Sequence, residues 1–314
     1  MKNLLCLLLV VALAGCAGNP GDKYADQQLS AARKTFKTSL VSSGIPRQAA
    51  PTAPAEFIQT VKYPAPSGML SAYLGFPPRD GSKKAGMVWI TGGDCNSIGS
   101  IWEPSPRTND QSANQYGNMV MMYPSLRGGN DNPGQKEGFL GEVDDVLAAA
   151  DFLAKQPGVD PNRIYLGGHS TGGTLALLTA QCSNRFRAVF AFGAVGDVSV
   201  YGNDHEMLPF DTSKPEEIEV RSPIYWLHCV QSPTFLIEGD GDGNDDELRR
   251  MKSASKNPQI HFLEVKGADH FSVLGASNGV IAKKLEADTG AAFNINLTED
   301  ELASAVAAAK QEEK

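Results

Sequence analysis

A glycine-flanked serine stands near the middle of the chain, in the sequence Gly168-His169-Ser170-Thr171-Gly172. The pattern G-x-S-x-G is typical of a nucleophile that is held on a tight turn between a strand and a helix. The turn leaves no room for side chains two positions away from the serine, which is why glycine is needed there. The backbone N–H of Thr171, at the start of the helix, is then expected to stabilise an oxyanion. We therefore predict that Ser170 is a catalytic nucleophile, and the alternative is a glycine turn that lets a helix pack closely on a sheet.

A serine hydroxyl needs a general base, which is most often a histidine. The chain has five histidines: His169, His205, His228, His261 and His270. His270 follows an apolar run at residues 260–265 and precedes a helical pattern. Loops at the carboxyl ends of strands are where open α/β sheets place their sites. We predict that His270 is the base.

Proteins with this serine motif carry their catalytic residues in the order Ser, acid, His along the chain. The acid is therefore expected in the loop after the strand that precedes residues 260–265. Residues 238–247, EGDGDGNDDE, offer several carboxylates in that loop. Asp242 lies deepest in a glycine-flanked turn, with Asp240 as its main rival. We predict that Asp242 accepts the Nδ1–H of His270, which would hold the imidazole in the required tautomer.

The same acidic loop resembles a calcium loop only in part. Asp240, Asp242 and Asn244 have the alternate spacing of calcium ligands. The sixth position, however, is Asp245 instead of glycine, and the twelfth is Met251 instead of glutamate. We predict no metal site here, and a serine hydrolase would need no metal or organic cofactor.

The elements around these residues predict an α/β protein with a mostly parallel sheet and helices on both faces. Strands are predicted at residues 57–63, 69–75, 86–90, 118–123, 163–167, 188–192, 233–238 and 260–265. Helices are predicted at residues 142–155, 174–182, 246–256, 271–285 and 302–310, the last after a capping box at Thr298. Together with the serine motif, this alternation indicates the α/β-hydrolase fold.

The N-terminus predicts export. Lys2 precedes a short apolar run at residues 4–14 and then Gly15-Cys16, which resembles the signal of a bacterial lipoprotein. We expect residues 1–15 to be a signal peptide, Cys16 to carry the lipid, and the protein to be held on a bacterial membrane, facing the periplasm in a Gram-negative cell. The alternative is an ordinary signal peptide with a chance cysteine. Residues 16–55, rich in Ala, Gly, Pro, Ser, Gln and Thr, predict a flexible tether.

The predicted domains are therefore a signal peptide (1–15), a tether (16–55), an α/β-hydrolase domain (56–290) and a C-terminal helical extension (291–314). The net charge of −8 and the pI of about 5.2 argue against nucleic acid as a partner. Three cysteines fall in the domain, and buried free thiols are favoured over one disulfide: Cys95, Cys182 and Cys229.

From about residue 57 to residue 285 the chain resembles the catalytic domain of the prolyl-oligopeptidase type of serine peptidases. The matching segments are YPSLRG at 123–128, GEVDD at 141–145, GHSTG at 168–172, RSP at 221–223, GDGD at 239–242 and GADH at 267–270. The resemblance implies that Asp242, rather than Asp240, is the acid.

This sequence departs from the family at the segment after the third strand, where members commonly carry a tyrosine or histidine beside two glycines or Gly-Pro. Here the segment reads Thr91-Gly92-Gly93-Asp94. We expect a backbone N–H near Gly92 or Gly93 to complete the oxyanion hole with Thr171. Large family members also carry a β-propeller that restricts access to peptides, and about forty residues before the domain leave no room for one.

The sequence thus predicts a serine hydrolase that forms an acyl-enzyme, as a peptidase acting on small peptides or as a carboxylesterase. A third hypothesis is a surface lipoprotein that keeps the fold but only binds a partner. Residues 195–222 are the expected lid or pocket wall, and Trp102 is expected to line the same pocket. Arg127 is expected to be either an anchor for a substrate carboxylate or a structural partner of Glu142 or Asp144.

Overall fold

The structure is a computed structural model that describes residues 18–42, 48–103, 116–202 and 205–312. It contains one eight-stranded sheet with the strand order β1-β2-β4-β3-β5-β6-β7-β8. The strands are β1 (Gln59–Ala65), β2 (Gly68–Leu74), β3 (Lys84–Ile90), β4 (Val120–Pro124), β5 (Val159–His169), β6 (Val189–Phe192), β7 (Thr234–Gly239) and β8 (Ile260–Val265). The β1–β2 and β2–β4 pairs are antiparallel, and the strands from β4 to β8 pair in parallel. The predicted α/β-hydrolase fold is confirmed.

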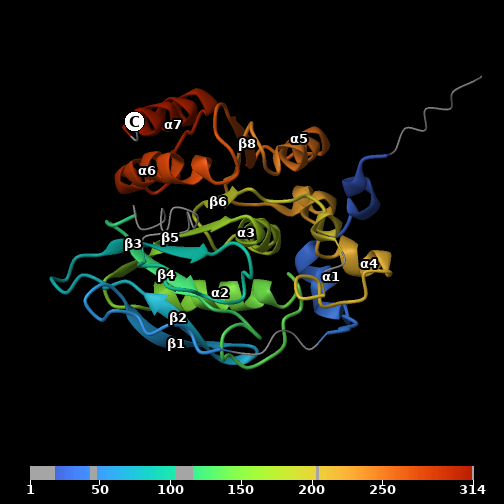
Figure 1. Cartoon of the computed structure of the whole chain (residues 1–314), viewed down its shortest axis with the longest axis horizontal. Helices are drawn as coiled ribbons and strands as arrows, with labels where there is room; N and C mark the ends of the chain where they lie inside the picture. The colour runs from blue at the N-terminus through green and yellow to red at the C-terminus, as the bar shows by residue number, and fades with distance from the viewer. Residues whose placement is uncertain (1–17, 43–47, 104–115, 203–204, 313–314) are drawn as a thin grey trace, which may run out of the picture.

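Helices cover both faces of this sheet (Figure 1). They are α1 (Leu29–Thr35), α2 (Glu142–Ala154), α3 (Thr171–Cys182), α4 (Pro215–Glu219), α5 (Asp245–Ala254), α6 (Ser272–Ala287) and α7 (Glu299–Glu312). Shorter 3₁₀ turns are η1 (Pro20–Tyr24), η3 (Val198–Tyr201), η4 (Pro223–Tyr225) and η5 (Leu227–Cys229).

Alternation along the strands divides the core between the two faces. In β3, Val88 and Ile90 point into the cluster that α2 and α3 complete, whereas Met87 and Trp89 point into the cluster that α6 and α7 complete. Side chains of a strand alternate between faces, so a continuously apolar strand is buried on both sides. This explains why the predicted apolar runs are the central strands.

The C-terminal helix begins as its capping box predicts. The Thr298 hydroxyl accepts a hydrogen bond from the Glu301 backbone N–H at 3.2 Å. Leu302 and Val306 are buried, and they belong to the cluster that α6 also lines. The helix is therefore packed on the domain rather than extended from it.

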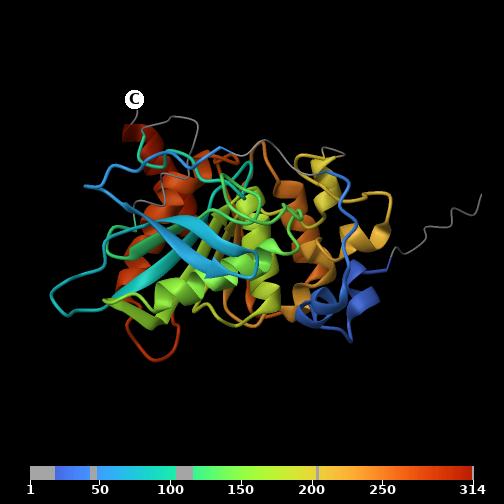
Figure 2. The ribbon, with the colours of Figure 1, turned by 90° about the horizontal axis from the view of Figure 1, so that it is seen from below.

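The structure corrects the predicted flexible tether. Residues 19–42, which we call the N-terminal strap, lie against the segment that contains α4 (Figures 1 and 2). Leu29 is fully buried, and the Tyr24 ring stacks on Trp226 with ring centres 4.5 Å apart. Composition predicted a mobile segment, but specific aromatic and apolar contacts with residues more than a hundred positions away hold it in place.

Cys16 and the predicted signal peptide lie outside the described residues. Within the described ranges, no helix has both the length and the apolar character needed to cross a bilayer. Cys95, Cys182 and Cys229 are free thiols in the structure, as favoured from the sequence.

Candidate active site

Ser170 occupies the turn between β5 and α3 in a backbone conformation that non-glycine residues rarely adopt. Its φ is 56° and its ψ is −118°. Such a conformation costs about 1–3 kcal/mol and persists only where the surroundings impose it. The Ser170 N–H donates to the Phe192 carbonyl at 2.8 Å, which ties the turn to the end of β6. Ser170 is partly exposed, so its hydroxyl can meet a substrate.

The glycines of the serine motif are required by close backbone contacts. A Cβ on Gly168 would lie 2.4 Å from the Gly172 carbonyl oxygen, and a Cβ on Gly172 would lie 2.3 Å from the Ile90 oxygen. Backbone cannot yield as a flexible side chain could. The glycines thus allow α3 to start directly against the carboxyl end of β3.

His270 lies in the loop between β8 and α6, close to the serine turn. A Cβ on Gly193 would lie 2.4 Å from the His270 Cε1, so the imidazole covers the residue that follows Phe192. Ser170 and His270 therefore both lie at the carboxyl end of the same strand, β6. In the described part of the chain no hydrogen bond joins the Ser170 hydroxyl to His270, and such contacts tighten when a substrate binds.

Glu238, not Asp242, is the carboxylate that meets the His270 ring. Glu238 Oε2 lies 2.9 Å from His270 Nδ1, and the Glu238 side chain is 1% exposed. Asp242 is exposed, and it contacts His270 only through its backbone carbonyl, which accepts the His270 N–H at 3.0 Å. Asp240 is exposed too, and its carboxylate accepts the Gly267 N–H. The prediction that the Asp242 side chain accepts the Nδ1–H is corrected.

Two backbone N–H groups hold the Glu238 carboxylate in place. Oε1 accepts the Gly239 N–H at 2.9 Å, and Oε2 accepts the Asn244 N–H at 3.2 Å. A buried carboxylate needs partners of this kind. The signal that could have found Glu238 is its place at the end of an apolar, buried strand, where a charged residue is expected only with a partner.

The predicted oxyanion segment lies beside the serine. A Cβ on Gly92 would stand 3.4 Å from the Ser170 Cβ, and the Thr171 hydroxyl donates to the Gly93 carbonyl at 2.8 Å. Gly93 has a φ of 71°, which favours glycine. The structure thus brings Thr171, Gly92 and Gly93 together around Ser170.

An ion pair between buried Lys136 and half-buried Asp94 holds this oxyanion segment. Lys136 Nζ lies 2.8 Å from Asp94 Oδ1, and the Ser97 hydroxyl donates to Asp94 Oδ2. Burial raises the pKa of Asp94, but the Lys136 charge and these hydrogen bonds outweigh it and leave the pKa below its usual value. The segment after β3 is therefore held at Asp94 by an ion pair and a hydrogen bond.

Arg127 is a structural residue. It contacts the Asp145 carboxylate through Nε at 2.8 Å and Nη2 at 2.9 Å, and its Nη1 lies 2.7 Å from Glu137. The structural alternative from the sequence is the one observed, but with Asp145 and Glu137 as partners. Asp144 pairs with Arg33 of the N-terminal strap instead.

The expected pocket wall, residues 195–222, begins beside the catalytic residues. Thr174, one helical turn after Ser170, accepts the Val195 N–H at 3.0 Å and lies 3.0 Å from the Tyr201 hydroxyl. Trp102 is placed elsewhere among the described contacts, against Tyr73 with ring centres 5.2 Å apart. It lines a hollow together with Phe57, Ile58 and Ile101.

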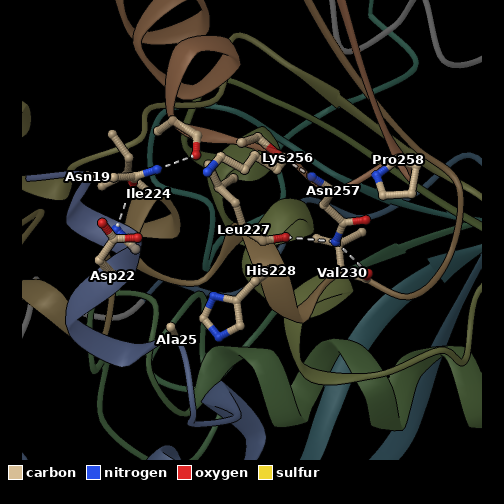
Figure 3. A pocket seen from close by; sticks show the side chains of 13 residues that line it. Asn19, Asp22, Ala25, Ile224, Leu227, His228, Val230, Lys256, Asn257 and Pro258 are labelled. Carbon is tan, nitrogen blue, oxygen red and sulfur yellow. Dashed lines mark hydrogen bonds between the residues drawn. The ribbon is translucent and has the colours of Figure 1, made fainter.

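A hollow of about 430 Å³ lies away from the catalytic residues. It lies between the N-terminal strap, η5 and the segment that precedes β8 (Figure 3). In Figure 3, Asn257 is hydrogen bonded to the Leu227 and Val230 carbonyls. Because this segment leads into β8 and His270 follows β8, the hollow and His270 lie at opposite ends of that strand.

No group of three or more His, Cys, Asp or Glu side chains within the described ranges is placed to hold a metal ion. The residues that the structure gathers here are a strained serine, an imidazole with a buried carboxylate on Nδ1, and a glycine segment beside a helix N-terminus. This set is suited to attack on a carbonyl carbon.

Comparisons with known proteins identify the family and the fold. A model of the prolyl oligopeptidase family matches residues 113–279, more than half of the chain. YtmA of Bacillus subtilis, an uncharacterized peptidase, is 27% identical over 195 residues, which cover 59% of this chain and 73% of that protein. POPB of Galerina marginata, a dual function macrocyclase-peptidase, is 28% identical over 187 residues, which cover 51% of this chain and 24% of that protein.

Two solved structures show the same fold at low identity. A puromycin-hydrolyzing peptidase of Mycobacterium tuberculosis has a TM-score of 0.61 and 18% identity, covering 77% of this chain and 41% of that chain. An esterase of Pyrobaculum calidifontis has a TM-score of 0.51 and 19% identity, covering 75% of this chain and 87% of that chain. The chain thus spans under half of the peptidase and most of the esterase.

Proposed function

Because the chain belongs to the prolyl oligopeptidase family, we propose that it is a serine hydrolase, a peptidase acting on small peptides through an acyl-enzyme. The observation that carries the proposal is the strained Ser170 turn at the same strand end as the Glu238–His270 pair. A serine without a role has no need of a φ of 56°.

In this proposal Ser170 Oγ attacks the carbonyl carbon of the substrate while His270 Nε2 takes its proton. Glu238 accepts the Nδ1–H, which fixes the tautomer and stabilises the imidazolium that forms. The Thr171 N–H and a donor from Gly92 or Gly93 stabilise the oxyanion. His270 then gives the proton to the leaving amine or alcohol, and a water molecule, deprotonated by His270, releases the acid from Ser170.

Carboxylesterase activity is the second candidate, since the esterase of Pyrobaculum calidifontis is matched over most of its length. The test uses the full chain with matched aminoacyl 4-nitroanilides, dipeptidyl 4-nitroanilides and 4-nitrophenyl esters, beside Ser170→Ala. Hydrolysis of the anilides that is lost in Ser170→Ala supports the peptidase. Hydrolysis of the esters alone supports the esterase, and no turnover of either class supports the binding protein.

We further propose that the protein is exported and anchored by a lipid on Cys16, on the strength of its N-terminal sequence. Metabolic labelling with a radioactive fatty acid tests this. Label is expected in the parent and not in Cys16→Ser, and equal label in both would refute the anchor.

A further inference from the structure

His169, the residue just before Ser170, contacts the loop that carries the base. It is the last residue of β5 and is 3% exposed. Its Nε2 lies 3.0 Å from the His270 carbonyl oxygen. A carbonyl oxygen can only accept, so Nε2 carries the hydrogen in this contact.

The other side of the His169 ring faces the oxyanion segment. A Cβ on Gly92 would lie 3.2 Å from His169 Nδ1. The ring also packs on the His270 ring, with centres 4.5 Å apart and planes tilted by 42°. His169 therefore lies between the oxyanion segment and the base, although Gly92 and His270 are far apart in sequence.

The His169 imidazole stays neutral in the folded protein. Burial, and secondly the nearby His270, lower its pKa to about 3. A second positive charge at this point would oppose the imidazolium that His270 forms in the reaction. A neutral ring can instead keep donating from Nε2 while His270 gains and loses its proton.

His270 is held at three points. Its N–H donates to the Asp242 carbonyl, its carbonyl accepts from His169, and its Nδ1 meets Glu238. The first two fix the backbone, and the third fixes the ring. A loop without the His169 contact would let the ring shift, and a shift of about 1 Å can reduce a rate roughly 100-fold.

We propose that His169 is a positioning residue for the reaction proposed above: it donates to the His270 carbonyl, packs on the His270 ring and thereby fixes the base relative to Ser170. The inference rests on the proposed function. A histidine that merely fills the core would contribute to stability without affecting the base.

The test compares His169→Phe, which keeps ring bulk but cannot donate, with His169→Gln, which can donate. His261→Phe is the matched control, because His261 stacks on Phe235 in β7 and makes no hydrogen bond or ring contact with the catalytic residues among those that the structure describes. Measurements on the full chain are kcat and KM for the best substrate, the thermal midpoint, and the low-field proton resonance of the His270 Nδ1–H.

We expect kcat to fall roughly 100-fold in His169→Phe with KM little changed. The resonance should shift or broaden in that variant, and His169→Gln should recover most of both.

Parent-like kcat and resonance in folded His169→Phe would overturn the inference. An equal loss in His169→Phe and His169→Gln would also overturn it, because the donor would not matter. A failure of the proposed function would give a different result: turnover would survive in Ser170→Ala, or the parent would show no turnover.

Discussion

At the scale of single residues, the carboxylate that pairs with His270 is Glu238. The sequence predicted Asp242 there. Several carboxylates follow β7 within ten residues, and Gly239 and Asp242 have the spacing of the family's acid. Spacing does not tell which carboxylate turns inward. Burial does: Glu238 is 1% exposed with two backbone donors, whereas Asp242 is exposed.

Replacing the two carboxylates one at a time tests this assignment. Glu238→Gln should lower kcat/KM by roughly 10³- to 10⁴-fold, because an amide can no longer fix the tautomer or balance the imidazolium. Asp242→Asn should leave kcat/KM nearly unchanged, since only its backbone carbonyl meets His270. The reverse pattern, with Asp242→Asn inactive and Glu238→Gln active, would restore the acid implied by the family resemblance.

The stability of the protein should depend on pH through His169. Its pKa is about 3 when folded and about 6.5 when unfolded. Between these values only the unfolded chain binds the proton, so stability falls as the pH falls. The loss from pH 6.5 to pH 5 is about 1–2 kcal/mol for this group.

Denaturant unfolding at both pH values measures this loss. His169→Phe and His169→Gln should lack this part of the pH dependence, whatever their stability at pH 7. An unchanged difference between the two pH values in both variants would mean that His169 is not held neutral by the fold.

At the scale of elements, the junction of β5 with α3 depends on glycine. In Gly172→Ala the new Cβ would lie 2.3 Å from the Ile90 oxygen, so α3 must move away from β3. We expect a loss of about 1–3 kcal/mol of stability together with loss of turnover. Gly99→Ala is the control, since nothing lies within 4 Å of its added Cβ. Equal unfolding midpoints and activities in the two variants would contradict the close packing.

The elements themselves could be predicted largely from the sequence. The apolar runs near residues 86–90 and 163–167 are long enough and apolar enough to be central strands, and β3 and β5 include them. The glycines of the G-x-S-x-G motif predicted a tight serine turn without room for side chains, and the close backbone contacts at Gly168 and Gly172 confirm it. The acid and the N-terminal strap were missed from the sequence, because both depend on contacts with residues that are distant in the sequence: His270 for Glu238, and Trp226 for Tyr24 of the strap.

At the scale of the whole molecule, the N-terminal strap packs against residues 210–221, which belong to the expected pocket wall. Buried Glu217 accepts the Thr38 hydroxyl at 2.9 Å, and Arg221 Nη2 donates to the same Thr38 oxygen at 2.7 Å. Leu40 pairs with Phe210 as an isolated β-bridge. The strap is therefore part of the folded domain, and a shortened chain without it would expose buried charges.

One matched pair of threonines tests the strap. Thr38→Ala removes a partner of the buried Glu217–Arg221 pair and should cost about 1–3 kcal/mol of stability. Thr35→Ala removes only an exposed bond to Ala32 within α1 and should stay within about 0.5 kcal/mol. Hydrogen exchange in residues 205–228 should rise in the first variant alone. Equal stability and exchange in both would show that residues 19–42 are a tether after all.

The central claim is that Ser170 is an activated nucleophile. Its most direct measurement is the reaction of the full chain with a fluorophosphonate, followed by peptide mapping of the adduct. We predict one adduct, on Ser170, whose formation is lost in Ser170→Ala and strongly slowed in His270→Ala and Glu238→Gln. A folded parent that forms no adduct, or an adduct that persists in Ser170→Ala, would contradict the account.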